Sequence, residues 1–189
     1  CDPLSAALAI VRGRVEPMDV ASVIQFDQVV FRSVHSIEWG LISDTDILSD
    51  SMRWLGSARF TVQALQLVAR KKLYEGKIKL LTPEAPSPGI DAPANSPLNP
   101  IVDGWTVIEG KFALVWAMNC THAASDMFTA PRAKLNDGCF DVLVIRGHAS
   151  RAAILGAFIA LESGKHVDNK EVEYYKAKEL THTHTHTHT

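Results

Sequence analysis

The sequence has no long hydrophobic run, few cysteines and no excess of positive charge, and each absence excludes a class of protein. No stretch reaches the roughly 18 consecutive apolar residues typical of a transmembrane helix, so we expect no membrane span. The net charge of -2 argues against a broad basic face, so we expect no nucleic-acid partner. The 3 cysteines are far apart and include no Cys-x-x-Cys pair, which favours a reducing, intracellular setting.

The composition is that of an ordinary globular domain. Apolar residues make up 47% of the 189 residues and charged residues 21%, which is typical of a chain that forms one full domain. The sequence starts at Cys1 instead of a methionine, and no signal peptide is visible. We therefore expect the chain to be a fragment of a longer protein.

The most informative segment runs from Trp39 to Phe60, WGLISDTDILSDSMRWLGSARF. Its acid Asp46 suits an amine or hydroxyl ligand. On one unbroken helix Arg53 and Arg59 would point away from each other, about 240° around the axis, but Gly56 lies between them and can end the helix. Both guanidinium groups could then face one phosphate, whose oxygens the planar fork binds in pairs. A capped surface helix with solvated charges explains the same residues, and the spacing alone leaves both interpretations open.

Hydrophobic periodicity predicts many strands and a few helices. Apolar residues at helical spacing predict helices at 3–13, at about 58–72 and from Ser150 to Gly164. Alternating or continuous apolar runs predict strands at 18–26, 29–35, 73–81, 105–108, 112–120, 140–146 and 172–175, with residues 109–111 joining two of them. Strands joined by tight turns, with helices packed on them, indicate a mainly β fold of the α+β class, an antiparallel β-sandwich.

Two segments differ in composition from the rest. Residues 82–104 hold six of the 9 prolines, which is typical of a flexible loop or linker. Residues 181–189 alternate Thr and His, as a bare dinucleotide repeat in the gene would encode. We exclude this tail from the fold and expect it to be disordered. No other cluster joins its histidines, so we expect no metal site.

Several motifs follow one another in a specific order. The central segment carries Trp39-Gly40, Ser43-Asp44-Thr45-Asp46-Ile47, Ser49-Asp50, Arg53, Leu55-Gly56 and Arg59-Phe60-Thr61. Later come Leu73-Tyr74-Glu75-Gly76-Lys77, 112–116, His122, Ser125-Asp126-Met127-Phe128, Ala130-Pro131, Ser150-Arg151-Ala152, Leu161-Glu162 and Gly164-Lys165-His166. Together, over residues 1 to about 180, this order resembles the sphingosine kinases, within the diacylglycerol-kinase-like lipid kinases.

The resemblance implies an activity and a domain plan. The activity is transfer of the γ-phosphate of ATP to the primary hydroxyl of sphingosine. Residues 1–13 resemble the last helix of the family's N-terminal nucleotide-binding domain, and residues 14–180 resemble its C-terminal lipid-binding domain. The family's Gly-rich loop, Gly-Asp-Gly motif and later Asp-Gly-Glu motif are absent from the sequence. ATP, Mg²⁺ and the general base would then belong to a missing domain, so we expect no catalytic residue here and no activity from this chain alone.

The resemblance also assigns binding roles to residues of this chain. Asp46 stands where the family binds the amine and hydroxyl of the sphingoid base, and an ammonium in an apolar site needs such an anion. Arg53 and Arg59 match arginines that reach the ATP phosphates. The other substrate-binding positions implied are Leu41, Ile42, Thr45, Phe60, Ala64, Met127, Leu143, Ile145, Ile154, Ala157, Phe158, Leu161 and His166. A plain hydrophobic core explains the apolar ones equally well, because an alkyl tunnel and a core wall use the same residue types.

The partners implied are sphingosine or a related long-chain base and a peripheral membrane surface in the cytoplasm, and the full-length protein could form a homodimer. Ceramide kinases and other diacylglycerol-kinase-like lipid kinases share these motifs and are the alternatives within the class. Asp46 favours a free-amine substrate over ceramide, because an amide needs no counter-anion. A non-catalytic lipid-binding module is the alternative from a different class.

Overall fold

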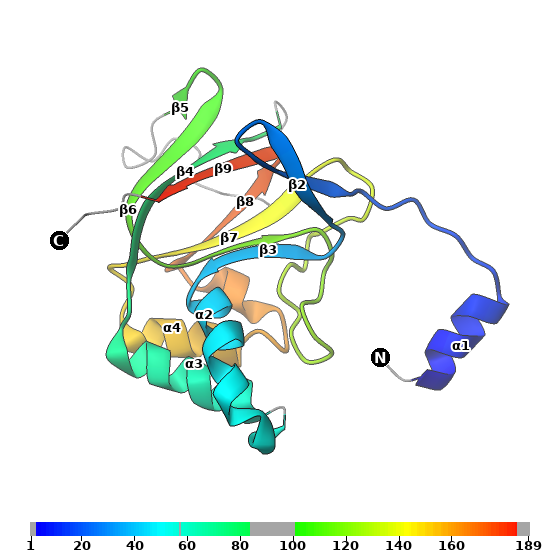
Figure 1. The fold of residues 1–189 in the computed structure, drawn as a ribbon, viewed down its shortest axis with the longest axis horizontal. Coiled ribbons are helices and arrows are strands. Elements are labelled where there is room, and N and C mark those ends of the chain that lie inside the picture. Colours follow the sequence, from blue (N-terminus) through cyan, green and yellow to red (C-terminus); the bar gives the residue numbers. More distant parts are fainter. Residues whose placement is uncertain (1–2, 57, 84–100, 185–189) are drawn as a thin grey trace.

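The computed structural model describes residues 3–56, 58–83 and 101–184 (Figure 1). The helices are α1 (Pro3–Val11), α2 (Leu41–Leu48), the 3₁₀ helix η1 (Ser49–Leu55), α3 (Ala58–Arg70), α4 (Arg151–Ile159) and the 3₁₀ helix η2 (Lys165–Asp168). The strands are β1 (Ala21–Gln25), β2 (Gln28–Ser33), β3 (Ser36–Gly40), β4 (Tyr74–Leu81), β5 (Ile101–Val102), β6 (Trp105–Met118), β7 (Phe140–Arg146), β8 (Val172–Ala177) and β9 (Glu179–His184).

One antiparallel sheet of 7 strands organises the chain. Its strands follow the order β8-β7-β6-β4-β9, and β3 and β5 also pair with β6. β6 is therefore central: β7 lies along one edge, while β4 and β3 share the other. The prediction of two strands joined at residues 109–111 is wrong, because each of these residues has a partner in β4 and β6 continues through them. Figure 1 shows this long strand curving through the sheet.

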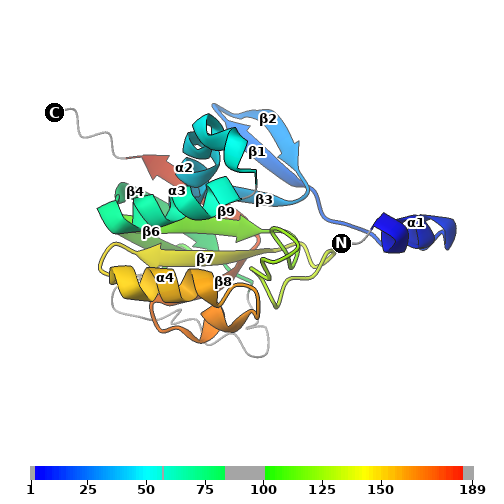
Figure 2. The same cartoon turned by 90° about the horizontal axis from the view of Figure 1, so that it is seen from below.

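The sheet has two apolar faces, and the alternation of side chains along β6 supplies both. Leu114, Trp116 and Met118 belong to one buried cluster, which also contains residues of α2, α3 and α4. Val115 and Ala117 belong to a second cluster, made mainly by strands and enclosed where the sheet curls. Figures 1 and 2 show α2, α3 and α4 together on one side of the sheet. The predicted antiparallel, sandwich-like α+β class is confirmed.

The N-terminal elements stand apart from this body. α1 follows the predicted helical pattern but buries none of its residues, and Figure 1 shows it away from the sheet. β1 and β2 form the predicted hairpin as a separate two-stranded sheet. Val29, Val30 and Phe31 of β2 are each at least 50% exposed. The assignment of residues 1–13 to another domain stays a prediction.

Both segments that we set aside by composition contribute a strand. Ile101 and Val102 form β5 and pair with β6 across the Asp103-Gly104 turn, in which both residues have positive φ, as a two-residue hairpin requires. Residues 181–184 belong to β9 and pair with β4. The predicted loop of residues 82–104 is therefore wrong from residue 101 onward, and the tail cannot be excluded as a whole. Residues 84–100 and 185–189 lie outside the described residues, so the rest of both predictions stays untested.

Candidate functional site

The site begins where β3 turns into α2. Gly40 joins them with a φ of 89°, and a Cβ there would lie 2.8 Å from the carbonyl oxygen of Ala113, so this turn requires glycine. Leu41, Ile42 and Thr45 are buried, and the Thr45 hydroxyl donates to the Leu41 carbonyl at 2.7 Å. These three residues, predicted to bind substrate, anchor α2 against the sheet.

The first acid of the Asp-Thr-Asp motif is held by two donors from another element. Asp44 Oδ2 accepts from Lys72 Nζ at 2.5 Å and from Tyr74 Oη at 2.6 Å. Burial and the Asp44 carboxylate raise the pKa of Tyr74, so its hydroxyl stays protonated and can donate. This contact ties α2 to the start of β4. No local spacing predicts it, because Asp44 lies 28 and 30 residues before its two donors.

The second acid has a different environment. Asp46 is exposed and lies in α2. Within the described residues it has no ion-pair partner. Glu38 of β3 is partly buried nearby: burial, followed by repulsion from Asp46, raises its pKa to about 7. Two acids therefore face this region without a basic partner among the described side chains, which favours the binding of a cation. Sequence reasoning missed Glu38.

The two arginines converge one helical turn further on. Arg53 Nε donates to Asp50 Oδ1 at 2.6 Å, and Arg59 Nη1 donates to the same oxygen at 3.3 Å. Gly56 separates η1 from α3 with φ 59° and ψ −137°, and this turn lets both side chains reach one point. The Arg59 guanidinium also lies 4.4 Å from the centroid of the Phe60 ring. Two converging guanidinium groups can bind one multiply charged anion.

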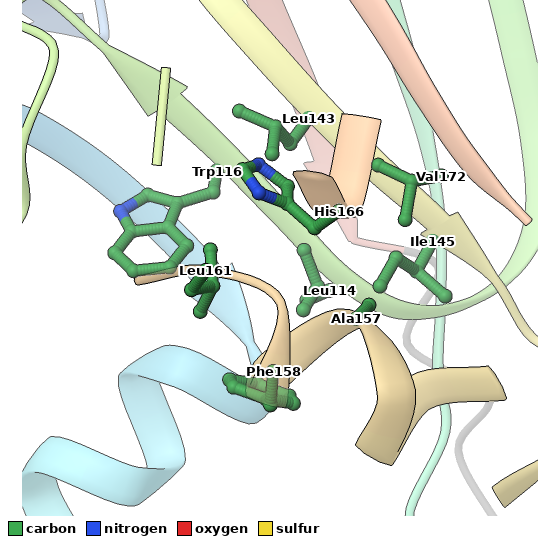
Figure 3. A pocket seen from close by; sticks show the side chains of 9 residues that line it. All are labelled: Leu114, Trp116, Leu143, Ile145, Ala157, Phe158, Leu161, His166 and Val172. Atoms are coloured by element: carbon green, nitrogen blue, oxygen red, sulfur yellow. The ribbon is translucent and has the colours of Figure 1, made fainter. Parts of the chain in front are cut away.

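An apolar pocket lies between the sheet and α4 (Figure 3). It is partly open to solvent, and its cavity volume is about 20 Å³, far below the roughly 300–1,000 Å³ typical of ligand pockets. Figure 3 shows Phe158 on the helix side and Leu143 on the sheet side. The pocket is lined by Leu114, Trp116, Leu143, Ile145, Ala157, Phe158, Leu161, His166 and Val172. A long alkyl chain does not fit in it as it stands.

His166 is the polar residue of this wall. Its Nε2 donates to the Thr129 carbonyl at 2.8 Å, and burial lowers its pKa, which favours the neutral imidazole. Trp116 is also buried, and its indole nitrogen has no hydrogen-bond partner among the described residues. The pocket can therefore take an uncharged, mainly apolar group.

Residues 35–188 match the family model of the YegS C-terminal NAD kinase beta sandwich-like domain. The chain belongs to this family. Sphingosine kinase 1 of Arabidopsis thaliana is 32% identical over 199 residues, covering 94% of this chain and 40% of that protein. Human sphingosine kinase 1 is 30% identical over 177 residues (87% and 46%), and human ceramide kinase 28% over 178 residues (77% and 32%). The chain thus spans less than half the length of the curated relatives it matches.

A solved structure supports the same fold for this YegS C-terminal domain. The crystal structure assigned to a diacylglycerol kinase of Bacillus anthracis str. Sterne has a TM-score of 0.54 and 20% sequence identity, over 95% of this chain and 50% of that chain. At this identity the likeness concerns the fold alone. The described helices include none long and apolar enough to cross a membrane, and the described side chains form no group that could hold a metal ion.

Apart from the four residues of α2 described above, the predicted lipid-binding residues fall into three groups. The pocket wall contains Leu143, Ile145, Ala157, Phe158, Leu161 and His166. Ile154 and Met127 belong to or contact the same core cluster without lining the pocket. Phe60 and Ala64 lie on α3, and Phe60 is 37% exposed beside Arg59. Three wall residues were not predicted: Leu114, Trp116 and Val172 follow the strand periodicity that also makes core, so their type alone carries no signal.

Proposed function

We propose that this chain is the lipid-binding half of a lipid kinase that phosphorylates sphingosine or a related long-chain base. ATP and Mg²⁺ would bind mainly to the other half, which would also carry the general base. The relatives named sphingosine kinases support this proposal over most of the chain. The observation that carries it is the combination of three environments in one domain: an apolar pocket, an acidic pair and two converging arginines. Glu38 of the acidic pair is the cross-strand partner of Trp116 in the pocket wall.

Each environment suits one part of the reaction. The apolar lining of the pocket suits an alkyl chain, and the pocket would have to widen to admit one. Asp46 and Glu38 suit the ammonium group, which loses hydration near apolar walls and needs an anion. Arg53 and Arg59 suit the phosphates of ATP, where they would stabilise charge during phosphoryl transfer. A substrate held this way would come from a membrane surface, so we propose a peripheral membrane location in the cytoplasm.

The acidic pair also separates this function from that of a ceramide kinase. Ceramide carries a neutral amide, and two unpaired carboxylates give it no ionic partner. The related ceramide kinase is less similar to this chain than the sphingosine kinases are. We therefore propose a free-amine lipid as the substrate.

Tryptophan fluorescence provides the test, because Trp116 lines the pocket. A sphingosine carrying a spin label on its alkyl chain should quench the fluorescence of the chain when it binds. Trp116→Phe should remove most of this quenching and leave binding intact, as measured with radiolabelled sphingosine. Equal quenching in the variant would place the alkyl chain elsewhere. Radiolabelled phosphate should appear in no lipid product when the chain alone receives sphingosine and ATP.

A further inference from the structure

One carboxylate oxygen occupies the point where the two arginines converge. Asp50 Oδ1 is 2.6 Å from Arg53 Nε and 3.3 Å from Arg59 Nη1. These hydrogen bonds lower the pKa of Asp50, with the bond from Arg53 as the largest cause, so the carboxylate is charged at neutral pH. An anionic oxygen bound by two guanidinium groups is the arrangement that a phosphate oxygen would adopt between them.

The arginines differ in how much they depend on Asp50. The Arg59 side chain is 21% exposed and lies over the Phe60 ring at 4.4 Å, so packing holds it without the carboxylate. The Arg53 side chain is 74% exposed, so its contact with Asp50 is freely broken and re-formed in water. The contact of Asp50 with the arginines therefore occupies the anion site and is not needed to hold Arg59 in place.

We propose that Asp50 is the built-in occupant of the anion site, which a polyphosphate must displace before it can bind both arginines. This inference rests on the proposed role of Arg53 and Arg59 in binding the ATP phosphates. Asp50 would then compete with the ligand and also screen the site against weak, singly charged anions. Those anions offer no more than the carboxylate already supplies, whereas a polyphosphate brings several charged oxygens.

The expected size of the competition follows from exposure. The Asp50 side chain is 57% exposed, and exposed ion pairs are only modestly populated over their open forms. A ligand that needs the open form has its affinity reduced by the open fraction. Loss of the carboxylate should therefore tighten polyphosphate binding by about two- to fivefold.

The experiment uses the 189-residue chain, labelled with ¹⁵N, and inorganic pyrophosphate as the probe. NMR follows the side-chain Nε–H signals of Arg53 and Arg59 during titration at constant ionic strength. In the wild type both signals should shift with one Kd. In Asp50→Asn the Kd should fall about two- to fivefold, and the Arg53 signal should start from the position of an unpaired guanidinium. The difference should persist at higher salt, because direct competition is screened less than a long-range charge effect.

Glu109→Gln is the matched control. It also removes one exposed acid from an ion pair, because Lys77 Nζ lies 3.0 Å from Glu109 Oε2. This pair does not include either arginine, so the variant should leave the Kd for pyrophosphate unchanged. Equal or weaker pyrophosphate binding in Asp50→Asn would overturn the competition and leave the anion site standing. If pyrophosphate shifts neither arginine signal in the wild type or in the variant, the anion site itself is wrong, and the role of Asp50 falls with it.

Discussion

Asp50 and Asp141 each accept hydrogen bonds from two side chains, but their environments are opposite. Asp50 lies at the exposed edge of η1, is 57% exposed and accepts from two arginines. Asp141 of β7 is fully buried and accepts from Tyr174 Oη at 2.7 Å and Lys176 Nζ at 2.6 Å. Lys176 also bonds Asp137 Oδ2 at 2.7 Å. The chemistry of the two clusters is similar, and the difference lies in their access to water.

The difference in access to water separates a cluster that can bind a ligand from one that stabilises the fold. Groups in water form ion pairs that contribute little to stability, so they remain available to a ligand. A buried pair contributes to the fold through the cost of leaving either charge without its partner. The cluster around Asp141 joins β7 and β8 to the loop before β7, and Asp141 itself is fully buried. Charge pairing alone therefore does not identify a binding site in this protein.

Asp141→Asn should give the largest effect in the molecule. It removes a buried charge from Lys176 and should lower the free energy of unfolding by about 3 kcal/mol, the lower end for a broken buried pair, because Asp137 remains as a partner. Chemical denaturation measures this. Asp126→Asn, at an exposed acid, should change stability little. A loss no larger in Asp141→Asn than in this control would contradict the structural role of the buried cluster.

Arg59→Ala should reverse the pattern, with a large effect on binding and a small one on stability. Loss of a charged hydrogen bond to phosphate should weaken pyrophosphate binding about tenfold or more. Calorimetric titration measures the Kd, and thermal melting measures stability. Arg70→Ala, at an exposed arginine in the last turn of the same helix, is the control. Equal anion affinity in the two variants would mean that Arg59 is only a surface charge.

Glu38→Gln should have an effect on stability that depends on pH. The folded pKa of Glu38 is about 7, raised from 4.5 by burial and then by Asp46. The fold therefore binds this proton more tightly than the unfolded chain, and stability falls as pH rises between these two values. The variant has no carboxyl group at this position and therefore does not pay the cost of ionising it in the fold. Its melting temperature minus that of the wild type should increase from pH 5 to pH 8. A constant difference across this range would contradict the shifted pKa.

Local patterns predicted the elements whose signals are local. Ser150 caps α4 as expected, with its Oγ accepting from the Ala153 amide at 3.0 Å. The hairpin of β1 and β2, helix α3 and strand β7 also follow from spacing of apolar residues. The Thr-His alternation misled us because its composition suggested a repeat. Its period of two, with a β-branched residue at every other position, is also a strand pattern, and β4 offers it an edge.

The site was only partly predictable, because only some of its residues carry a local signal in the sequence. A glycine between two arginines is a local signal, and the structure brings both guanidinium groups to one oxygen. Glu38 and the Lys72–Asp44–Tyr74 contact depend on elements that meet only in the fold, so no spacing reveals them. The apolar pocket residues cannot be told from core by type, because both must exclude water.

The central claim is that the acidic group beside the pocket binds the ammonium of a long-chain base. Asp46→Asn keeps the shape of the side chain, removes its charge and lies on an exposed face of α2, so the fold should be unaffected. Binding of radiolabelled sphingosine and ceramide to the wild type and the variant, at equal pH and salt, tests the claim most directly. We expect the sphingosine Kd to rise about tenfold or more, equivalent to roughly 1.4 kcal/mol, with ceramide binding and melting temperature unchanged. Unchanged sphingosine binding in a normally folded variant would contradict the claim and favour a neutral lipid.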